Sequence, residues 1–413
     1  MRAEIIVIGD EILIGQTVDT NSAFIGSELS KLGFDVYRKV AIHDNKTDIL
    51  EALAAAAGKA DLVMITGGLG PTSDDITKPV LCEFFNTELG LNQEVLAMIE
   101  EMMRKRGWQM NENNRKQAEV PLSCTILWNA VGTAPGMRFE KDGTFFFSLP
   151  GVPNEMKYLM TTHILPWLKQ KFRTQAIIHK NIMTYGLGEA LLAEKLTDFE
   201  AQLPLEIKLA YLPSLGMIKL RLTAIGKDRK YLEPIISDQV KKLYLIIPEL
   251  IFAEDEETFE VVIGRLLRKR HQTIATAESC TGGRIAQMIT SIPGSSAYFK
   301  GSVIAYDNAV KTMLLGVPEE ELASHGAVSR EVVERMAEGV RKLLNTDFSI
   351  ATTGIAGPDG GSEQKPVGTV WIAVSSSSGT VSEKYIYGND RNTTISRFAV
   401  AALNLARRQI IRQ

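Results

Sequence analysis

The chain has 413 residues, enough for two or three domains of ordinary size. Its net charge is −3 with both signs interspersed, so it has no basic footprint for nucleic acid or an anionic membrane. Its three cysteines are far apart, which argues against a disulfide framework and a structural zinc site. No signal peptide and no bilayer-length apolar run are visible, so we expect a soluble protein in the reducing cytoplasm.

The first 168 residues alternate strands with helices, which predicts a parallel α/β sheet. The apolar runs 5–8 and 62–66 are typical of strands buried on both faces, and a further strand is expected at 35–40. Helices are expected from about Asp19 and over 47–57. In such sheets, ligands bind beyond the carboxyl ends of the strands.

The third of these strands runs into a glycine-rich turn, Thr66-Gly-Gly-Leu-Gly-Pro71, followed by Asp74 and Asp75. Its glycines let a ligand approach the backbone closely, and backbone N–H groups there suit a phosphate. The two carboxylates could hold a divalent cation against that phosphate, or they could simply cap the next helix. The candidate ligand-binding glycines are Gly67, Gly68 and Gly70, and the candidate metal ligands are Asp10, Glu11, Asp44, Asp74 and Asp75.

These motifs resemble the molybdopterin-binding (MoCF-like) domain that forms the N-terminal half of CinA proteins. The matching pieces are Gly9-Asp-Glu-Ile-Leu13, Thr66-Gly-Gly-Leu-Gly-Pro71 with Asp75, and Leu149-Pro-Gly-Val-Pro-Asn-Glu-Met156. The resemblance implies a nucleotide-binding domain that hydrolyses the pyrophosphate of ADP-ribose with a divalent metal (Mg, Mn or Co). Relatives bind pterins on the same scaffold, so a non-catalytic nucleotide- or pterin-binding domain is the alternative.

Residues 169–255 form a smaller α+β pattern, and CinA proteins carry a KH-like segment here. A KH domain clamps nucleotides with a GxxG loop between basic residues, whereas this chain has Gly186-Leu-Gly188 followed by Glu189. We interpret the segment as a connecting and dimerisation element without nucleic-acid binding. The acidic run Glu254-Asp-Glu-Glu257 is expected to begin the first helix of the third domain. The middle segment's expected strands are 176–185, 207–212 and 217–224, and its expected helices are 189–199 and 229–243.

The third domain, residues 256–413, is organised around the stretch Thr273-Ile-Ala-Thr-Ala-Glu-Ser-Cys-Thr-Gly-Gly283, which predicts a strand, a tight turn and a helix N-terminus. Ser279 is the side chain best placed for chemistry, and Cys280 is the rival nucleophile. An ordinary turn that closes a strand–helix unit is the alternative. A serine needs a neighbouring base, for which Lys311 and His325 are the local candidates.

Four motifs of this domain resemble the CinA C-terminal domain, a family that includes nicotinamide mononucleotide (NMN) deamidases: Ala277-Glu-Ser-Cys-Thr-Gly-Gly283, Tyr306-Asp-Asn-Ala-Val-Lys311, His325-Gly-Ala-Val-Ser329 and Gly354-Ile-Ala-Gly-Pro-Asp-Gly-Gly361. The resemblance implies Ser279 as nucleophile, Lys311 as base and Tyr306 close by, with no cofactor. Arg391 would face the substrate phosphate, although Gly388-Asn-Asp-Arg391 has an asparagine that the family's Gly-Asp-Arg lacks. The other substrate-binding candidates are Thr281, Gly282, Gly283, Thr353 and Gly354.

The whole chain is therefore expected to be a bifunctional cytoplasmic hydrolase of NMN and ADP-ribose that forms a homodimer. One alternative keeps the deamidase and makes the N-terminal domain a non-catalytic sensor. Another is a competence- or recombination-associated partner protein. The third domain's expected helices are a core-facing one from Phe259, one from Arg284, 309–315 and 330–344; its expected strands are 273–277, 303–306, 348–353 and an antiparallel pair, 370–375 and 381–387.

Overall fold

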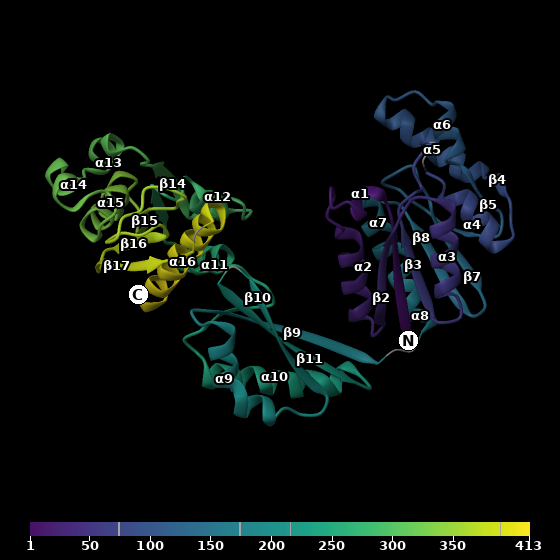
Figure 1. Cartoon of the computed structure of the whole chain (residues 1–413), viewed down its shortest axis with the longest axis horizontal. Coiled ribbons are helices and arrows are strands. Elements are labelled where there is room, and N and C mark those ends of the chain that lie inside the picture. Colours follow the sequence, from purple (N-terminus) through teal and green to yellow (C-terminus); the bar gives the residue numbers. More distant parts are fainter. Residues whose placement is uncertain (73–74, 173–174, 215, 389) are drawn as a thin grey trace. The chain divides into compact units, whose positions relative to one another are not determined.

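The structure is a computed structural model of the chain, shown in Figure 1, and it describes residues 1–72, 75–172, 175–214, 216–388 and 390–413. The chain divides into two compact units. The first comprises Met1–His179 with Ala224–Ile235, and the second comprises Lys180–Thr223 with Ile236–Gln413. Among the described residues, no helix is both long and apolar enough to cross a membrane.

The first unit is built on a mostly parallel sheet. Its strands are β1 (Arg2–Ile8), β2 (Asp35–Ile42), β3 (Leu62–Thr66), β4 (Leu89–Leu91), β5 (Glu119–Pro121), β6 (Thr125–Leu127), β7 (Gly136–Lys141) and β8 (Thr144–Leu149). The main sheet has the order β2-β1-β3-β8-β7-β6. The first four strands are parallel to one another, and β7 pairs antiparallel with β8 on one side and with β6 on the other. The predicted parallel α/β fold is confirmed, and the antiparallel edge extends it.

Helices cover both faces of this sheet (Figure 1). Successive side chains of a strand point to opposite faces, so Ile5 packs in the cluster of α2 and α7, while Ile6 packs in that of α3 and α4. Asp19 caps α2 by accepting the Ser22 N–H at 2.9 Å. The helices are α1 (Asp10–Leu13), α2 (Thr20–Lys31), α3 (Lys46–Ala56), α4 (Thr77–Phe85), α5 (Gln93–Arg106), α6 (Glu112–Lys116), α7 (Pro153–Leu159) and α8 (Leu165–Lys171), with a π-helical turn at Met160–Ile164.

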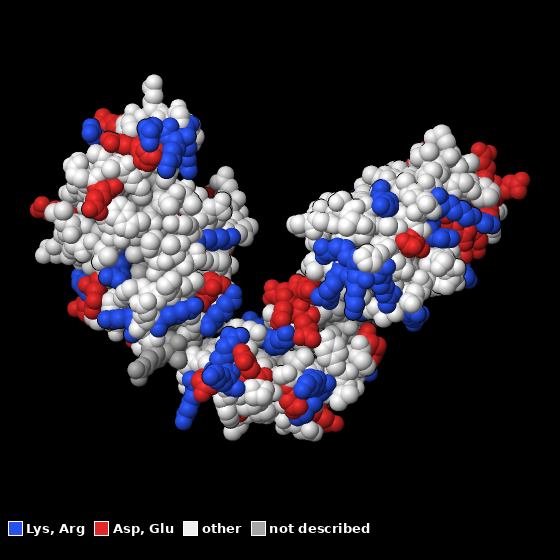
Figure 2. Space-filling view, turned by 180° about the vertical axis from the view of Figure 1, so that it is seen from behind, with Lys and Arg blue, Asp and Glu red and all other residues white. Residues whose placement is uncertain are grey.

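The middle segment is a small α+β module, as expected. Its elements are β9 (Ala176–Tyr185), α9 (Glu189–Ala201), β10 (Ile207–Ser214), β11 (Met217–Gly226), α10 (Arg229–Ile246) and β12 (Ile251–Glu254). The strands form one sheet of order β10-β11-β9-β12. Figure 2 shows basic and acidic side chains on each unit of the chain on the face that it displays.

The acidic run of residues 254–257 starts with the last residue of β12 and does not begin a helix. The expectation that it would begin one was wrong. Asp255 and Glu256 adopt left-handed backbone angles, with φ of 53° and 68°, and helix α11 starts only at Phe259 (Phe259–Arg270). Lys180 Nζ lies 2.6 Å from an Asp255 carboxylate oxygen, and Lys219 Nζ lies 2.8 Å from one of Glu256. The acidic side chains thus pair with lysines of β9 and β11 rather than with a helix dipole.

The rest of the second unit is an α/β domain around a five-stranded sheet of order β14-β13-β15-β16-β17. Its strands are β13 (Ile274–Glu278), β14 (Phe299–Ile304), β15 (Phe348–Gly354), β16 (Thr369–Ser376) and β17 (Gly379–Ile386). The first three in spatial order are parallel, and β16 and β17 form the predicted antiparallel pair. The helices are α12 (Arg284–Thr290), α13 (Asn308–Leu315), α14 (Glu319–His325), α15 (Arg330–Leu343) and α16 (Arg391–Arg412), with a 3₁₀ turn at Ser295–Ala297.

Helix α16 was not predicted from the sequence, yet it supplies much of this domain's core. Every residue from Phe398 to Arg407 is buried. Together with α11 and α12 it covers one face of the sheet, while α13 and α15 cover the other (Figure 1). Arg391 is the first residue of α16, so this core helix fixes where that arginine lies.

Candidate active site and nucleotide pocket

Three parallel strands of the second unit end at one edge of the sheet and bring the predicted catalytic residues there. Ser279 directly follows β13, Tyr306 lies two residues after β14, and the loop that begins at Gly354 leaves β15. Ser279 is buried at 9% exposure, and its N–H donates to the Thr352 carbonyl at 3.0 Å. The turn of residues 279–283, called the nucleophile turn below, therefore lies where parallel α/β sheets bind their ligands.

Lys311 is buried beside this turn. It projects from α13, is only 1% exposed, and its Nζ donates to the Tyr306 carbonyl at 3.1 Å. Burial lowers the pKa of Lys311, against the opposing influence of Asp307 and the Cys280 thiol. Within the described part of the chain, no hydrogen bond joins the Ser279 hydroxyl to the Lys311 amine. Such bonds are often long before the substrate binds.

Cys280, the rival nucleophile, is buried and electrostatically unsuited to attack. It is 6% exposed and packs in the domain's main core cluster. Burial raises the pKa of its thiol to about 12. Since the thiolate is the reactive form, roughly one thiol in 10⁴ would be ionised at pH 8.

Tyr306 and Arg391 meet at the rim of the site, although they lie far apart in the sequence. Arg391 Nη2 donates to the Tyr306 hydroxyl at 3.1 Å, and Nη1 donates to the Gly357 carbonyl. Both side chains reach solvent, and Tyr306 is 61% exposed. The extra asparagine before this arginine, Asn389, lies outside the described residues. Arg391 nevertheless reaches the predicted catalytic tyrosine.

A cavity of about 550 Å³ opens next to the nucleophile turn. Its volume lies within the range of small-molecule sites, about 300–1,000 Å³. Two of the predicted substrate-binding threonines are engaged inside the protein: the Thr281 hydroxyl lies 2.7 Å from that of Thr352, and the Thr353 hydroxyl donates to the Ala327 carbonyl at 2.7 Å. The cavity is lined by Thr281, Gly282, Gly283, Arg284, Gln287, Asn392, Ile395 and Ser396.

A buried carboxylate that the sequence analysis did not single out holds the nucleophile turn in place. Glu278, the last residue of β13, is fully buried. Its Oε2 accepts the N–H groups of Gly283 and Ile285, both at 3.0 Å, and its Oε1 accepts that of Ala286 at 2.8 Å. Glu278 thus satisfies the free N–H groups at the start of α12, whose N-cap residue, Gly283, has no side chain to do so.

Hydrogen bonds within the turn leave fewer backbone N–H groups that could donate to an oxyanion. The Gly282 N–H donates to the Ser279 carbonyl at 3.1 Å, and that of Gly283 is taken by Glu278. Of the backbone N–H groups from 280 to 283, those of Cys280 and Thr281 remain without a backbone acceptor among the residues described. These two are the candidates to stabilise a developing oxyanion.

We predict that Glu278→Gln lowers both stability and activity. An amide offers one acceptor oxygen for three N–H groups and turns a donor toward one of them, so the free energy of unfolding should fall by about 2–3 kcal/mol. Denaturant unfolding and an assay of the Ser279 site measure the two effects. Glu319→Gln, an exposed acid in the first turn of α14, is the matched control. An unchanged unfolding midpoint for Glu278→Gln would contradict this role.

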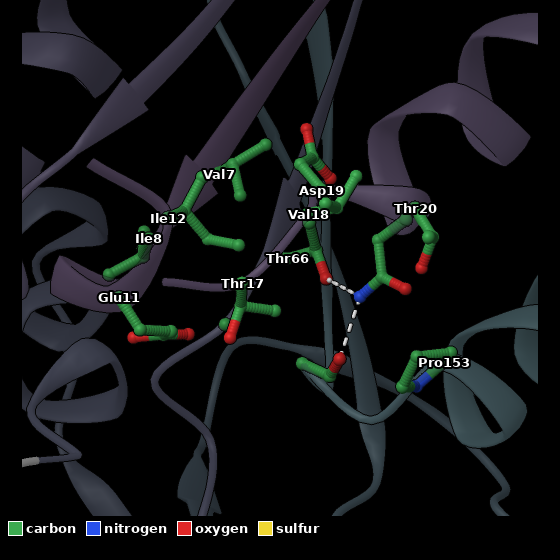
Figure 3. A pocket seen from close by; sticks show the side chains of 13 residues that line it. Val7, Ile8, Glu11, Ile12, Thr17, Val18, Asp19, Thr20, Thr66 and Pro153 are labelled. Carbon is green, nitrogen blue, oxygen red and sulfur yellow. Dashed lines mark hydrogen bonds between the residues drawn. The ribbon is translucent and has the colours of Figure 1, made fainter. Parts of the chain in front are cut away.

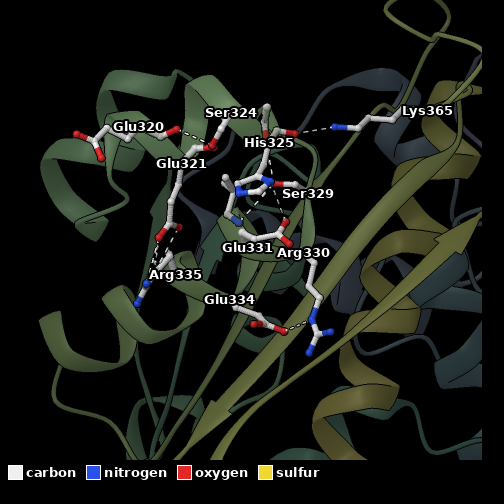
Figure 4. A network of polar contacts seen from close by, with 12 residues as sticks. Glu320, Glu321, Ser324, His325, Ser329, Arg330, Glu331, Glu334, Arg335 and Lys365 are labelled. Atoms are coloured by element: carbon white, nitrogen blue, oxygen red, sulfur yellow. Dashed lines mark hydrogen bonds and ion pairs between the residues drawn. The ribbon is translucent and has the colours of Figure 1, made fainter.

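His325, the other candidate base, belongs to a network of polar contacts on α14 and α15 (Figure 4). Its Nδ1 lies 3.9 Å from a Glu331 carboxylate oxygen, and its carbonyl accepts Lys365 Nζ at 2.8 Å. Nearby, Arg335 Nη2 pairs with Glu321 at 3.0 Å. These contacts tie the side chain and the carbonyl of His325 to Glu331 and Lys365.

The first unit has its own pocket, at the carboxyl ends of β1 and β3 (Figure 3). It encloses about 110 Å³. Asn21 Nδ2 donates to the Thr66 hydroxyl at 3.1 Å and to the Gly151 carbonyl at 2.7 Å. Asn21 is 7% exposed, and its Oδ1 is buried without a hydrogen-bond partner among the described residues. An unpaired buried acceptor is costly, so this pocket is suited to a ligand that donates a hydrogen bond.

The predicted glycine turn lies beside this pocket, and only glycine fits at two of its positions. Gly67 lines the pocket, with φ of 116°, and a Cβ there would lie 2.1 Å from the Ile8 carbonyl oxygen. At Gly68, with φ of 65°, a Cβ would lie 2.0 Å from the Thr77 hydroxyl. The turn therefore packs its backbone directly against the end of β1 and the start of α4.

Two of the acidic side chains expected to bind a metal, Asp75 and Asp10, have other partners. Both Asp75 oxygens accept backbone N–H groups, from Gly70 at 2.7 Å and Thr72 at 3.0 Å, so Asp75 caps the loop. Asp10 pairs with His43 at 2.7 Å. Glu11 lines the pocket, Asp44 lies beside Gly68, and Asp74 falls outside the described residues. The structure as described holds no group of three or more His, Cys, Asp or Glu side chains suited to a metal ion, and the metal site stays a prediction.

Comparison with known proteins divides the chain into three successive matched ranges. Family models match three successive ranges: "Probable molybdopterin binding domain" over residues 4–170, "Damage-inducible protein CinA KH domain" over 179–253, and "CinA C-terminal domain" over 256–410. A CinA-like protein of Flavobacterium psychrophilum is 49% identical over 416 residues, covering 100% of this chain and 99% of that protein. The chain belongs to the CinA family.

A second CinA-like protein, from Cytophaga hutchinsonii, is 48% identical over 408 residues, covering 99% of this chain and 98% of that relative. Among solved structures, competence damage-inducible protein A from Klebsiella pneumoniae is 30% identical. That match covers 38% of this chain and 98% of the Klebsiella chain, with a TM-score of 0.36. Full-length similarity to CinA proteins therefore comes from the sequence relatives.

In this CinA protein the KH-like segment carries a Gly186-Leu-Gly188 loop followed by Glu189, rather than a basic GxxG clamp. We predict no specific binding of single-stranded DNA or RNA at physiological salt, since Glu189 stands where a KH clamp needs a basic residue and the chain has a net charge of −3. Fluorescence anisotropy with labelled oligonucleotides measures this directly. A sub-micromolar complex that weakens steeply with added salt would refute it.

Proposed function

We propose that the C-terminal domain deamidates NMN to nicotinic acid mononucleotide and ammonia. The observation that carries the proposal is the buried Lys311, whose lowered pKa favours a neutral amine, beside a nucleophile turn at the carboxyl end of parallel strands. A neutral lysine can accept a proton, which an ordinary surface lysine at neutral pH cannot. Membership in the CinA family supports the same chemistry.

In the proposed reaction, the Ser279 hydroxyl attacks the carboxamide carbon and its proton passes to Lys311. The carbonyl oxygen of the substrate becomes an oxyanion, which the N–H groups of Cys280 and Thr281 stabilise. The Lys311 ammonium then protonates the amide nitrogen, and ammonia leaves an acyl ester on Ser279. A water molecule gives a proton to Lys311 and attacks the ester carbon. Lys311 returns that proton to the Ser279 oxygen as the ester bond breaks, which releases the acid and restores both residues.

The rim residues fit the other end of this substrate. Arg391 is a guanidinium on the exposed side of the site, and planar donors of this kind bind phosphate through two parallel hydrogen bonds. Tyr306, bonded to Arg391, offers an aromatic face next to it. The 550 Å³ cavity beside the nucleophile turn leaves room for a mononucleotide.

Incubating the purified protein with NMN, in the presence and absence of EDTA, tests this function. We expect nicotinic acid mononucleotide and stoichiometric ammonia in both conditions, detected by chromatography and a coupled ammonia assay. Nicotinamide riboside, which lacks the phosphate, is the matched substrate control and should turn over poorly. Failure to form the acid from NMN under any condition would rule the proposal out.

We further propose that the N-terminal domain binds a nucleotide and hydrolyses the pyrophosphate of ADP-ribose with a divalent metal. The observation in favour is the pocket at Gly67, where the buried Asn21 Oδ1 lacks a hydrogen-bond donor among the described residues. A ribose hydroxyl or the exocyclic amine of a base would supply one. The alternative, a non-catalytic nucleotide- or pterin-binding domain, predicts binding without cleavage.

We predict that Asp75→Asn abolishes ADP-ribose cleavage and leaves deamidation intact. Asparagine keeps one acceptor oxygen, turns an amide donor toward the N–H of Gly70 or Thr72, and removes the negative charge that a hard cation needs, so an unchanged unfolding midpoint is required of this variant. Chromatography of AMP and ribose 5-phosphate measures the effect, and EDTA should reproduce it in the unaltered protein. Asp142→Asn, a turn residue between β7 and β8, is the control. Cleavage that survives both EDTA and Asp75→Asn would exclude the metal mechanism.

A further inference from the structure

We propose that the second unit contains an additional binding site, between the Gly186–Gly188 loop and strand β17, for a small aromatic anion of the nucleoside monophosphate class. The site is a cavity of about 400 Å³, within the range of about 300–1,000 Å³ typical of small-molecule pockets. It shares no lining residue with the nucleophile turn or with the pocket of the first unit, so it does not rest on the proposed function. Its lining comprises Tyr185, Gly186, Leu187, Gly188, Gly216, Tyr385, Tyr387 and Arg397.

Aromatic side chains give the cavity flat apolar surfaces. Tyr385 of β17 and Tyr387, one residue beyond the end of that strand, have nearly parallel rings, 9° apart in plane and 5.8 Å between centroids. The Tyr185 hydroxyl lies 3.1 Å from that of Tyr387. Burial raises the pKa of Tyr385 and of Tyr387, so their hydroxyls stay neutral and add no negative charge to the cavity. Such rings stack on the π-face of any nucleobase.

Arg397 supplies a positive charge that no other described residue pairs with. It lines the cavity and makes no hydrogen bond or ion pair with any described residue, and its Nε is buried without an acceptor among them. Arg397 is only partly buried, so the rest of its guanidinium can reach the cavity. An anionic ligand there would pair with that part of the guanidinium.

Glu383, the acid that accepts the hydroxyl of the cavity tyrosine Tyr385, is already paired. The Glu383 carboxylate accepts Arg408 Nη2 at 2.6 Å and the Tyr385 hydroxyl. Arg408 and Glu383 thereby form a closed pair beside the cavity. Arg397 therefore remains available to a ligand.

The opposite wall favours an anion as well. Gly188 is the N-cap of the thirteen-residue helix α9, and among the described residues no side chain accepts a hydrogen bond from its first turn, in which the acid Glu189 is exposed and does not line the cavity. Free N–H groups and the helix dipole at such an end attract a phosphate. The cavity thus combines aromatic faces, an unpaired guanidinium and a helix N-terminus, which together match a base joined to a phosphate.

Isothermal titration calorimetry of the full-length protein with AMP tests this site, with adenosine and inorganic phosphate as partial ligands. Arg397→Met removes the charge but keeps the length of the side chain. Gly188→Leu adds a side chain at a position with an ordinary φ of −74°, where a Cβ would meet no heavy atom within 4 Å. Arg412→Met, on the same helix as Arg397 but outside the cavity, is the matched control.

We expect AMP to bind in a phase that Arg397→Met and Gly188→Leu each weaken at least tenfold and that Arg412→Met leaves unchanged. This phase should persist in Ser279→Ala and Asp75→Asn proteins, which separates it from the other two sites. Adenosine and phosphate should each bind more weakly than AMP. An AMP isotherm that none of the cavity substitutions alters, in variants that melt like the parent protein, would overturn the proposal.

Discussion

Replacing Ser279 by alanine is expected to reduce NMN deamidation by about a thousandfold or more, because a residue in a nucleophile–base unit takes the whole unit with it. Cys280→Ala should retain most of the activity, since burial raises the pKa of this thiol to about 12 and leaves almost no thiolate. The measurement is kcat for NMN in matched preparations. The small cavity left by removing a buried sulfur should cost some stability but little rate.

Mild alkylation supplies an independent check. A buried, protonated thiol reacts slowly with iodoacetamide, so the deamidase activity should survive a treatment that modifies accessible cysteines. Cys124 is only partly buried, yet burial raises the pKa of its thiol to about 11, so a free thiol added to the mixture must report on the extent of labelling. An active Ser279→Ala protein together with an inactive Cys280→Ala protein would make this a thiol amidohydrolase instead.

Lys311→Met is expected to lower kcat by about 10²–10⁴-fold, the usual contribution of general acid–base catalysis. Methionine matches the apolar stem of lysine, so the buried site at 1% exposure stays filled. In the unaltered enzyme, kcat/KM should rise with pH as Lys311 loses its proton, and the midpoint should lie below the ordinary lysine value of about 10.4 because burial lowers this pKa. The residual activity of Lys311→Met should lack this rise.

The lowered pKa of Lys311 also makes the free energy of unfolding depend on pH. The direction of that dependence distinguishes a lysine that is neutral in the folded protein from one that is held charged. Between the lowered folded pKa and the unfolded value of about 10.4, the unfolded chain binds a proton that the folded chain does not, so stability increases with pH. Below that window, burying the charged form is unfavourable. Lys311→Met should therefore flatten the pH dependence of unfolding without lowering the midpoint at pH 7. A variant that loses activity only because it unfolds would disprove the catalytic role.

Much of the fold follows from local patterns that tertiary packing does not override. The apolar run at 62–66 matches β3, and 176–185 matches β9, because buried strands need continuous or alternating apolar residues. Helix α16 escaped prediction for the opposite reason. Ten successive residues, Phe398–Arg407, are buried, so the middle of this helix shows a continuous buried run rather than an apolar stripe with a period of 3.6.

The residues of the candidate site also fall into those that a sequence motif suggests and those that no local pattern suggests. Ser279, Lys311 and Arg391 could be proposed from motifs, and the structure places the first at the strand end, the second in the core and the third against Tyr306. Glu278 could not be recognised, since a carboxylate that ends a buried strand has no local signal for its partners, which lie five to eight residues onward. The one usable hint is a helix start with glycine as N-cap, which must find its acceptor elsewhere.

The position of Arg391 at the head of α16 bears on how the active site is completed on the ribosome. Phe398 and its neighbours seal the hydrophobic core around β13, β15 and β16, yet roughly 120 residues separate Ser279 from this segment, a delay of about 6–24 s at ordinary rates of synthesis. Until α16 is synthesised, the nucleophile turn belongs to a sheet with one uncovered apolar face. Chaperones bind exposed apolar surface of this kind. A polypeptide that terminates prematurely before Arg391 would carry both residues of the Ser279–Lys311 pair and still lack the arginine proposed to bind phosphate and the helix that closes the core.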